Sequence, residues 1–241
     1  MSEEISRTAL LKEGVQAVAP LAVGAFPFSF IVGALSVSIG MGVAESTLMS
    51  LFVFAGSAQI VALNLLSSSA SLLIILLTTL VINARHILYS VSLSEYIKTY
   101  PLFIRALMAF GLTDEVYACS IHRLTSLGNH PFRHYFYLSA MFGFWGSWVM
   151  ANLFGALAGS QFPQIQTMGL DFAMVATFIA IVVPQLKSRQ SIVAAAIAVL
   201  SGLALIALPF QSGLIIASVL GVVAGLTMEK LVNSRKQNVW E

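Results

Sequence analysis

The chain has 241 residues, of which 58% are hydrophobic and 9% are charged, and its formal net charge is +2. An average soluble domain carries roughly 25% charged residues, so this composition excludes a soluble enzyme and a disordered chain. The hydrophobic residues also form continuous blocks of about 20, the length that crosses a bilayer core of roughly 30 Å. The sequence therefore predicts an all-α, polytopic helical membrane protein.

We expect about eight spans in a single transmembrane domain of residues 15–232, with short flanking segments at 1–14 and 233–241. The predicted spans are about 15–39, 47–67, 70–90, 103–122, 135–158, 170–186, 191–208 and 212–231. If the N-terminus lies inside, most Lys and Arg residues fall in the inner segments, as the positive-inside rule requires. The sequence therefore predicts that both termini are cytoplasmic.

The first predicted span is interrupted by residues that disfavour a regular helix. Pro20, Gly24, Pro27 and Gly33 all lie inside it, and a proline removes a backbone donor and crowds the preceding turn. We expect a broken first helix whose half-helix end, near Gly24 and Pro27, offers a partial charge to a substrate. A structural proline kink is the alternative.

The second and third spans carry uncharged polar residues and one arginine. Around Gln59 the small residues of Ala55–Gln59 allow close approach of a ligand, or simply tight helix packing. The third span contains Thr79, Asn83, His86 and Ser90 on one helical face. Arg85 lies two residues after Asn83. If the helix is regular, these two side chains point in opposite directions; alternatively the helix breaks near Ala84. Arg85 could bind a carboxylate with its planar fork or extend to the interface.

Acidic residues mark the fourth and sixth spans. Asp114 and Glu115 would each cost roughly 2.5–3.5 kcal/mol at the centre of a bilayer, so we expect them to face protein, water or a positive charge. They suit a cation, ammonium or proton site, or else a structural ion pair. Asp171 begins the sixth span, where it either binds substrate or favours the helix dipole.

Other motifs point away from cofactor chemistry. His130 and His134 lie four residues apart, but no third metal ligand is evident nearby in the sequence. No P-loop, dinucleotide fingerprint or hydrolase motif occurs. The basic residues lie between apolar blocks, which indicates membrane orientation and not nucleic-acid binding. We therefore expect no enzymatic activity, no cofactor and no metal.

A faint internal repeat is also visible. Gly33-Ala34-Leu35 and Gly155-Ala156-Leu157 lie 122 residues apart. This offset would pair residues 15–122 with 135–232. In so apolar a chain, accidental similarity is the alternative.

The polar motifs, taken in order, resemble those of the AzlC-type family, the large subunit of branched-chain amino-acid exporters. The resemblance covers roughly residues 15–186, and its matching stretches are Pro20–Gly33, Ser50–Gln59, Asn83–Ser90, Leu112–Glu115 and Leu170–Ala173. It implies export of valine, leucine, isoleucine and, as a further candidate, methionine. It also implies a small hydrophobic AzlD-like partner subunit in the inner (plasma) membrane of a bacterium.

Secondary transport of a zwitterion requires partners for both of its charges. We expect Arg85, or the half-helix end near Gly24 and Pro27, to meet the carboxylate. Asp114, Glu115 or Asp171 would meet the ammonium, and the resemblance also favours roles for Gln59 and Asn83. The alternative is a structural or regulatory membrane subunit of a transporter complex whose substrate is another small solute.

Overall fold

The computed structural model describes residues 6–162, 183, 186–206, 208 and 212–237. These residues form helices and no strand, which confirms the all-α prediction for the described chain. The helices, in chain order, are α1 (Arg7–Ser38), α2 (Val43–Phe52), α3 (Gly56–Ser67), α4 (Leu72–Asn83), α5 (Arg85–Ile97), α6 (Leu102–Phe110), α7 (Asp114–Leu127), α8 (Arg133–Gln161), α10 (Arg189–Ala204) and α11 (Ser212–Gln237).

The helices belong to two units. The first unit comprises Met1–Leu63 and Asn83–Leu170 and contains α1, α2, α5, α6, α7 and α8. The second comprises Asn64–Ile82 and Asp171–Glu241 and contains α10, α11 and nearly all of α4, while α3 passes from one unit into the other. All but one of the polar residues proposed from the sequence as substrate ligands belong to the first unit.

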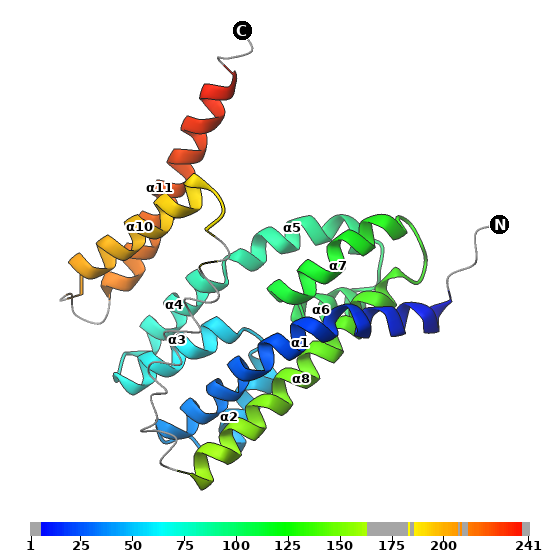
Figure 1. The fold of residues 1–241 in the computed structure, drawn as a ribbon, viewed down its shortest axis with the longest axis horizontal. Coiled ribbons are helices and arrows are strands. Elements are labelled where there is room, and N and C mark those ends of the chain that lie inside the picture. The colour runs from blue at the N-terminus through cyan, green and yellow to red at the C-terminus, as the bar shows by residue number, and fades with distance from the viewer. Residues whose placement is uncertain (1–5, 163–182, 184–185, 207, 209–211, 238–241) are drawn as a thin grey trace. The chain divides into compact units, whose positions relative to one another are not determined.

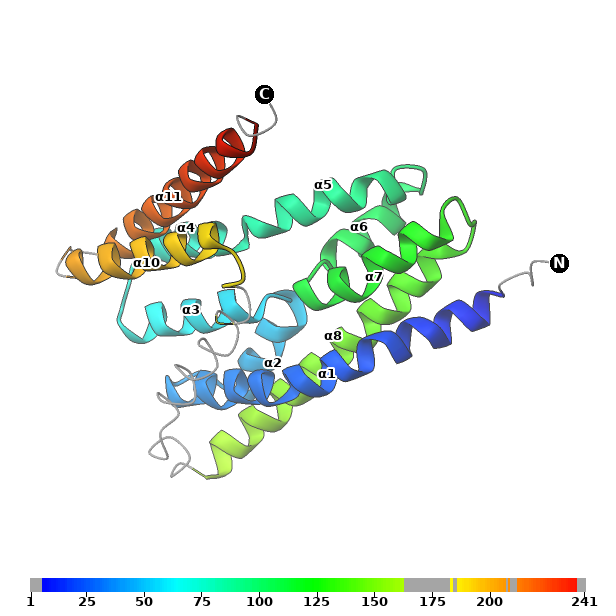
Figure 2. The same cartoon turned by 45° about the horizontal axis from the view of Figure 1, so that its top comes forward.

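The first unit is built around α1 and α8, which run side by side (Figures 1 and 2). Glycines bring their backbones into contact: a Cβ on Gly33 would collide with the backbone of Asn152, and one on Gly155 with the backbone of Phe30. Gly14 meets Phe136 in the same way, closer to the start of both helices. Since early residues meet early ones and late residues meet late ones, α1 and α8 run in the same direction.

The contacts between α1 and α8 share the offset of the faint repeat. A shift of 122 residues takes Gly33 to Gly155 and Phe30 to Asn152. The contact of Gly33 with Asn152 therefore corresponds, with the two helices interchanged, to the contact of Gly155 with Phe30. Gly14 and Phe136 are themselves 122 residues apart. If the chain contains two repeats, α1 and α8 would be their first helices, and contacts at this constant offset are what we would expect between them. The repeat itself stays a prediction.

Two helices are long and apolar enough to cross a membrane in the described chain, namely α1 and α8. A third is added only if α4 and α5 are taken as one interrupted span, so the count of eight is not confirmed. Each of the predicted spans 47–67, 70–90 and 103–122 is interrupted, at residues 53–55, 84 and 111–113 respectively. The helical, apolar character of a membrane protein is clear, but regular crossings are few.

The prediction of a broken first helix is wrong. α1 continues from Arg7 to Ser38 through both Pro20 and Pro27. Both prolines are exposed, as is Gly24, which has no neighbouring atom within 4 Å of a Cβ position. Because α1 packs on α8 both before and after the prolines, tertiary contacts hold it as one helix. The segment around Gly24 and Pro27 therefore offers no half-helix end.

The second unit contains a close helix pair, α10 and α11 (Figure 1). A Cβ on Gly221 would come within 2.8 Å of the Cβ of Ala198, and one on Gly225 within 3.1 Å of the Cβ of Ala194. Small residues four apart allow such close approach in membrane helices. This pair therefore packs closely through small side chains.

Candidate functional site

Three helices of the first unit begin directly after an interruption, and their first residues meet. Arg85 is the first residue of α5, Asp114 is the first residue of α7, and Ser57 lies in the first turn of α3. One guanidinium nitrogen of Arg85 (Nη1) donates to Oδ2 of Asp114, and the other (Nη2) donates to Oγ of Ser57 at 2.9 Å. A single arginine therefore links the starts of α3, α5 and α7.

The helix dipoles affect Asp114 and Arg85 in opposite ways. The start of a helix carries a partial positive charge, so Asp114 stabilises α7, where Thr113 also caps the helix by accepting from the Val116 amide at 3.3 Å. Arg85 is unfavourable at the start of α5 by the same rule. Its pairing with Asp114 offsets that cost, and the position leaves a fixed cation beside a fixed carboxylate.

The ion pair is accessible and not saturated with hydrogen bonds. The side chains of Arg85 and Asp114 are 29% and 32% exposed. Three buried polar atoms near the helix starts have no hydrogen-bond partner: Oδ1 of Asn83, Nε of Arg85 and Oδ1 of Asp114. Native proteins leave few such atoms unpaired, and those that remain call for an explanation. A ligand with both donor and acceptor groups would complete this set.

Aromatic contacts hold α5 against α7 next to the ion pair. The rings of Tyr89 and Tyr117 stack with their centroids 4.7 Å apart. The hydroxyl of Tyr117 donates to Oγ of Ser92 at 2.8 Å. Glu115, which follows Asp114 in the first turn of α7, is half-buried. The start of α7 therefore carries two carboxylates, of which Asp114 pairs with Arg85.

A second arginine fixes the opposite ends of the same helices. Arg133, at the start of α8, is 6% exposed and donates to the carbonyl oxygens of Tyr96 and Gly128. These carbonyls lie at the ends of α5 and α7, where backbone acceptors lack helical partners and a cation is favourable. α5 and α7 are therefore tied together at both ends, by Arg85 at their starts and by Arg133 at their ends.

The sequence did not identify Arg133 as special, because it reads as one more basic residue beside His130 and His134. Those histidines make local contacts: Nδ1 of His130 accepts from the Phe132 amide at 3.2 Å, and the ring of His134 lies 4.7 Å from that of Tyr100. α8 begins at Arg133 with Phe132 as its N-cap. Pro131, just before the N-cap, is the sequence signal that could have indicated a helix boundary near Arg133.

Gln59 does not contact Arg85 but belongs to a separate buried network. Its Nε2 donates to Oγ of Ser50 at 2.9 Å, and its Oε1 accepts from Nε1 of Trp148 at 3.0 Å. Gln59 and Ser50 are fully buried. The network joins α2, α3 and α8 across the interruption at residues 53–55, so it supports the helix start that carries Ser57.

Asn152 extends this network on α8, and the sequence analysis did not single it out. Its side-chain amide hydrogen-bonds Oγ of Ser46 at 3.1 Å, and both residues are fully buried. Ser46 and Ser50 lie four residues apart on α2, a spacing that places them on one face. Polar residues repeated at that spacing in an apolar helix are the signal that could have revealed the network.

The remaining sequence predictions concern the helix around Ala84, the pair Gly24 and Pro27, and Asp171. The helix breaks at Ala84, so Asn83 ends α4 and Arg85 begins α5; the alternative of a break is confirmed, and a regular helix is wrong. Gly24 and Pro27 lie at exposed positions of α1. Asp171 lies outside the described residues.

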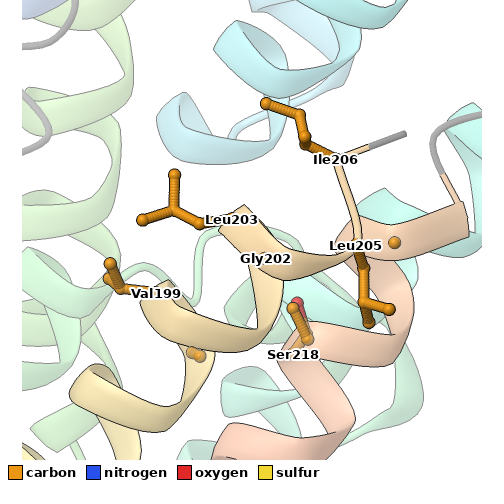
Figure 3. Close-up of a pocket in the computed structure, with 9 residues that line it drawn as sticks. Val199, Gly202, Leu203, Leu205, Ile206 and Ser218 are labelled. Carbon is orange, nitrogen blue, oxygen red and sulfur yellow. The ribbon is translucent and has the colours of Figure 1, made fainter. Parts of the chain in front are cut away.

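The second unit contains an apolar hollow between α10 and α11 with a volume of about 680 Å³ (Figure 3). Its lining includes Val199, Leu203 and Leu205 from the α10 side and Ser218 from α11. None of the described residues that line this hollow is charged. The hollow therefore offers no charged partner to a zwitterion among these residues.

Comparisons with known proteins place these residues in a family. The profile of the AzlC protein family matches residues 20–162. The inner membrane protein YgaZ of Escherichia coli is 30% identical over 225 residues, covering 90% of this chain and 89% of the relative. The branched-chain amino acid transport protein AzlC of Bacillus subtilis is 32% identical over 149 residues, covering 61% of this chain and 57% of the relative.

A further relative, an uncharacterized membrane protein of Archaeoglobus fulgidus, is 32% identical over 188 residues, 77% of this chain and 80% of its own length. No solved structure gives a significant match. The matched region contains α2, α3, α5, α6 and α7, and therefore the whole ion-pair site. The chain belongs to the AzlC family of membrane proteins.

Proposed function

We propose that this protein is a secondary transporter that exports branched-chain amino acids, with Arg85 and Asp114 holding the two charges of the substrate. The observation that carries the proposal is the ion pair itself, which is partly exposed and lies where three interrupted helices begin. Interrupted helices with charged groups at their ends are a recurring design of transporter substrate sites. The name of the Bacillus subtilis relative supports the substrate class.

The substrate would enter by exchanging partners with the ion pair. Arg85 would turn its planar fork from Asp114 to the substrate carboxylate, and Asp114 would accept from the substrate ammonium. Each charge keeps an opposite charge beside it throughout, so no isolated charge is exposed to the low dielectric of the site. The unpaired Oδ1 of Asn83 and Nε of Arg85 supply the remaining hydrogen bonds.

The empty transporter would close on the same pair. With no substrate, Arg85 and Asp114 bind one another and hold α5 against α7; with substrate bound, that direct contact is released. The ion pair would thus have two states, one in direct contact and one opened by substrate. Alternating access requires two such states, because the substrate must interact differently with each. Glu115 would serve as a proton-accepting group beside the pair if export is proton-coupled.

The membrane arrangement we propose has about eight crossings, with both termini cytoplasmic. In it the pairs α2–α3, α4–α5 and α6–α7 each form one interrupted crossing. The common direction of α1 and α8 is consistent with the first and fifth crossings of this topology. The location would be the inner membrane of a bacterium, as the name of the Escherichia coli relative suggests, with an AzlD-like subunit as partner.

The test is efflux from cells that lack their own exporters and are loaded with a leucine- or valine-containing dipeptide. The chain would be expressed alone, with its small partner, and not at all. Faster appearance of external amino acid with both proteins supports the proposal, and Asp114→Asn should abolish the gain. Glu95→Gln is the matched control, because Glu95 is exposed on the neighbouring helix.

A second arm separates a transporter from a structural or regulatory subunit. The purified chain, with and without its partner, would be reconstituted in liposomes loaded with leucine. If the partner alone transports at the rate of the complex, the site in this chain is not the translocation site. If efflux requires this chain and its Arg85, the transporter proposal holds.

A further inference from the structure

A second pair of opposite charges joins α7 to α1. Nη2 of Arg123 donates to Oε2 of Glu13 at 2.8 Å, and its Nε lies 2.7 Å from the other carboxylate oxygen. The side chains of Arg123 and Glu13 are 31% and 41% exposed. Nη2 makes the hydrogen bond of this pair, while the buried Nε has no hydrogen-bond partner among the described residues. It lies within the first unit but shares no residue with the pair of Arg85 and Asp114.

A cavity of about 290 Å³ lies next to this second pair. Its wall contains two chemically different parts. Glu13, His122, Arg123 and Ser126 supply charged or polar groups, while Ala17, Cys119 and Phe136 supply less polar surface. Such a wall, which combines apolar surface with polar groups that fix orientation, suits a small amphipathic ligand.

α7 connects this cavity to the first ion pair. Asp114 begins α7 and Arg123 follows nine residues later, about 13 Å further along the helix axis. Glu115, Cys119 and His122 share one face of α7, because they are spaced by four and three residues. A polar stripe therefore leads from the carboxylates at the start of α7 to the cavity.

We propose that this cavity is a second binding site for a zwitterion of the same class as the transported substrate. The proposal rests on the transport function proposed above. Arg123 would take the carboxylate, Glu13 the ammonium, and the side chain would lie over Ala17 and Phe136. Because Glu13 lies near the start of α1, a cytoplasmic N-terminus would make this the site that substrate reaches before Arg85 and Asp114.

Cys119 provides a direct probe, because it is the single cysteine of the chain and lines the cavity. The experiment measures the rate at which N-ethylmaleimide alkylates the purified full-length protein, with and without leucine. At leucine roughly ten times its Kd, occupancy should slow alkylation about tenfold. Isocaproate, which lacks the ammonium, and isopentylamine, which lacks the carboxylate, should protect much less. Cys119→Ala shows that the signal comes from this thiol.

Two variants separate this site from the first one. Arg123→Gln should abolish protection by leucine, whereas Arg85→Gln should leave it in place. Arg123→Lys, which retains the charge, should recover part of the protection and so exclude simple misfolding. Unchanged alkylation with leucine, or loss of protection in Arg85→Gln alone, would overturn the proposal.

A zwitterionic lipid headgroup also combines an ammonium with an anion, so the lipid is varied independently. In nanodiscs of phosphatidylglycerol, whose headgroup carries no ammonium, leucine should protect Cys119. If phosphatidylethanolamine protects without leucine and leucine adds nothing, the occupant is a lipid and the amino-acid assignment is wrong. If leucine is exported but never protects Cys119, only the second site fails. If leucine is neither exported nor protective, the transport proposal fails with it.

Discussion

Arg85 and Asp114 each occupy the first position of a helix, and they pair although 29 residues separate them in the sequence. The dipole of α7 stabilises Asp114, whereas the dipole of α5 destabilises Arg85. The pair therefore combines a well-placed anion with a cation that depends on its partner. In the proposed mechanism, a ligand that supplies a carboxylate to Arg85 would replace Asp114, and this exchange would switch the pair between two states.

Replacing Arg85 by lysine should impair export although the positive charge is kept. Lysine offers a point charge and no planar fork, so it cannot bond Ser57 and a carboxylate in the same geometry. Loss of one hydrogen bond to a charged group, worth roughly 1.5–3 kcal/mol, should raise KM by about tenfold or more. Initial efflux rates at several internal leucine concentrations give KM. Arg105→Lys, on an exposed position of α6, is the control, and an equal KM in both variants would contradict bidentate binding.

Asp114→Asn and Arg85→Gln should be strongly non-additive. Each single change leaves the other charge without its partner, whereas the double variant removes both charges. For residues in direct contact, the coupling free energy is on the order of 0.5–3 kcal/mol. Thermal unfolding of the four proteins in detergent measures this coupling. Additive effects would show that the two side chains do not interact in solution.

Arg133→Gln should destabilise the first unit more than the loss of an exposed arginine. It removes the charged donor of the carbonyl oxygens of Tyr96 and Gly128, and a hydrogen bond from a charged group is worth roughly 1.5–3 kcal/mol. We expect a lower Tm, with Arg133→Lys in between. Arg105→Gln provides the exposed comparison. A Tm equal to that of Arg105→Gln would mean that Arg133 does not hold the ends of α5 and α7.

Two glycines of α1 should respond oppositely to the same substitution. A methyl group on Gly33 would collide with the backbone of Asn152, so Gly33→Ala must force α1 away from α8. Gly24 has open space at its Cβ position, and alanine there should stabilise the helix by up to about 1 kcal/mol. Detergent-extracted yield and Tm distinguish the two variants. Equal losses would refute the close contact of α1 and α8.

The sequence by itself determined that the chain is helical and belongs in a membrane, because its apolar blocks leave too little charge for a soluble surface. It also selected Arg85 and Asp114, since a charge in an apolar segment is costly unless it has a partner or a function. Thr113 followed by two acidic residues is the pattern of a helix start, and α7 begins there, but the prediction of one span over 103–122 did not use this signal.

The sequence could not determine where the helices break. Apolar residues lie on both sides of residues 53–55 and 111–113, so hydropathy shows one continuous span in each case. A break depends on whether neighbouring elements satisfy the freed backbone groups. For the same reason Pro20 and Pro27 predicted a break that packing on α8 prevents.

Only the tertiary structure decided which polar residues meet. Gln59 and Arg85 both looked like substrate ligands, yet Gln59 is saturated by Ser50 and Trp148, while Arg85 reaches Asp114 and Ser57. Arg133 looked like one basic loop residue among several. These outcomes follow from contacts between residues distant in sequence, and local composition carries no record of which distant partner the fold brings near.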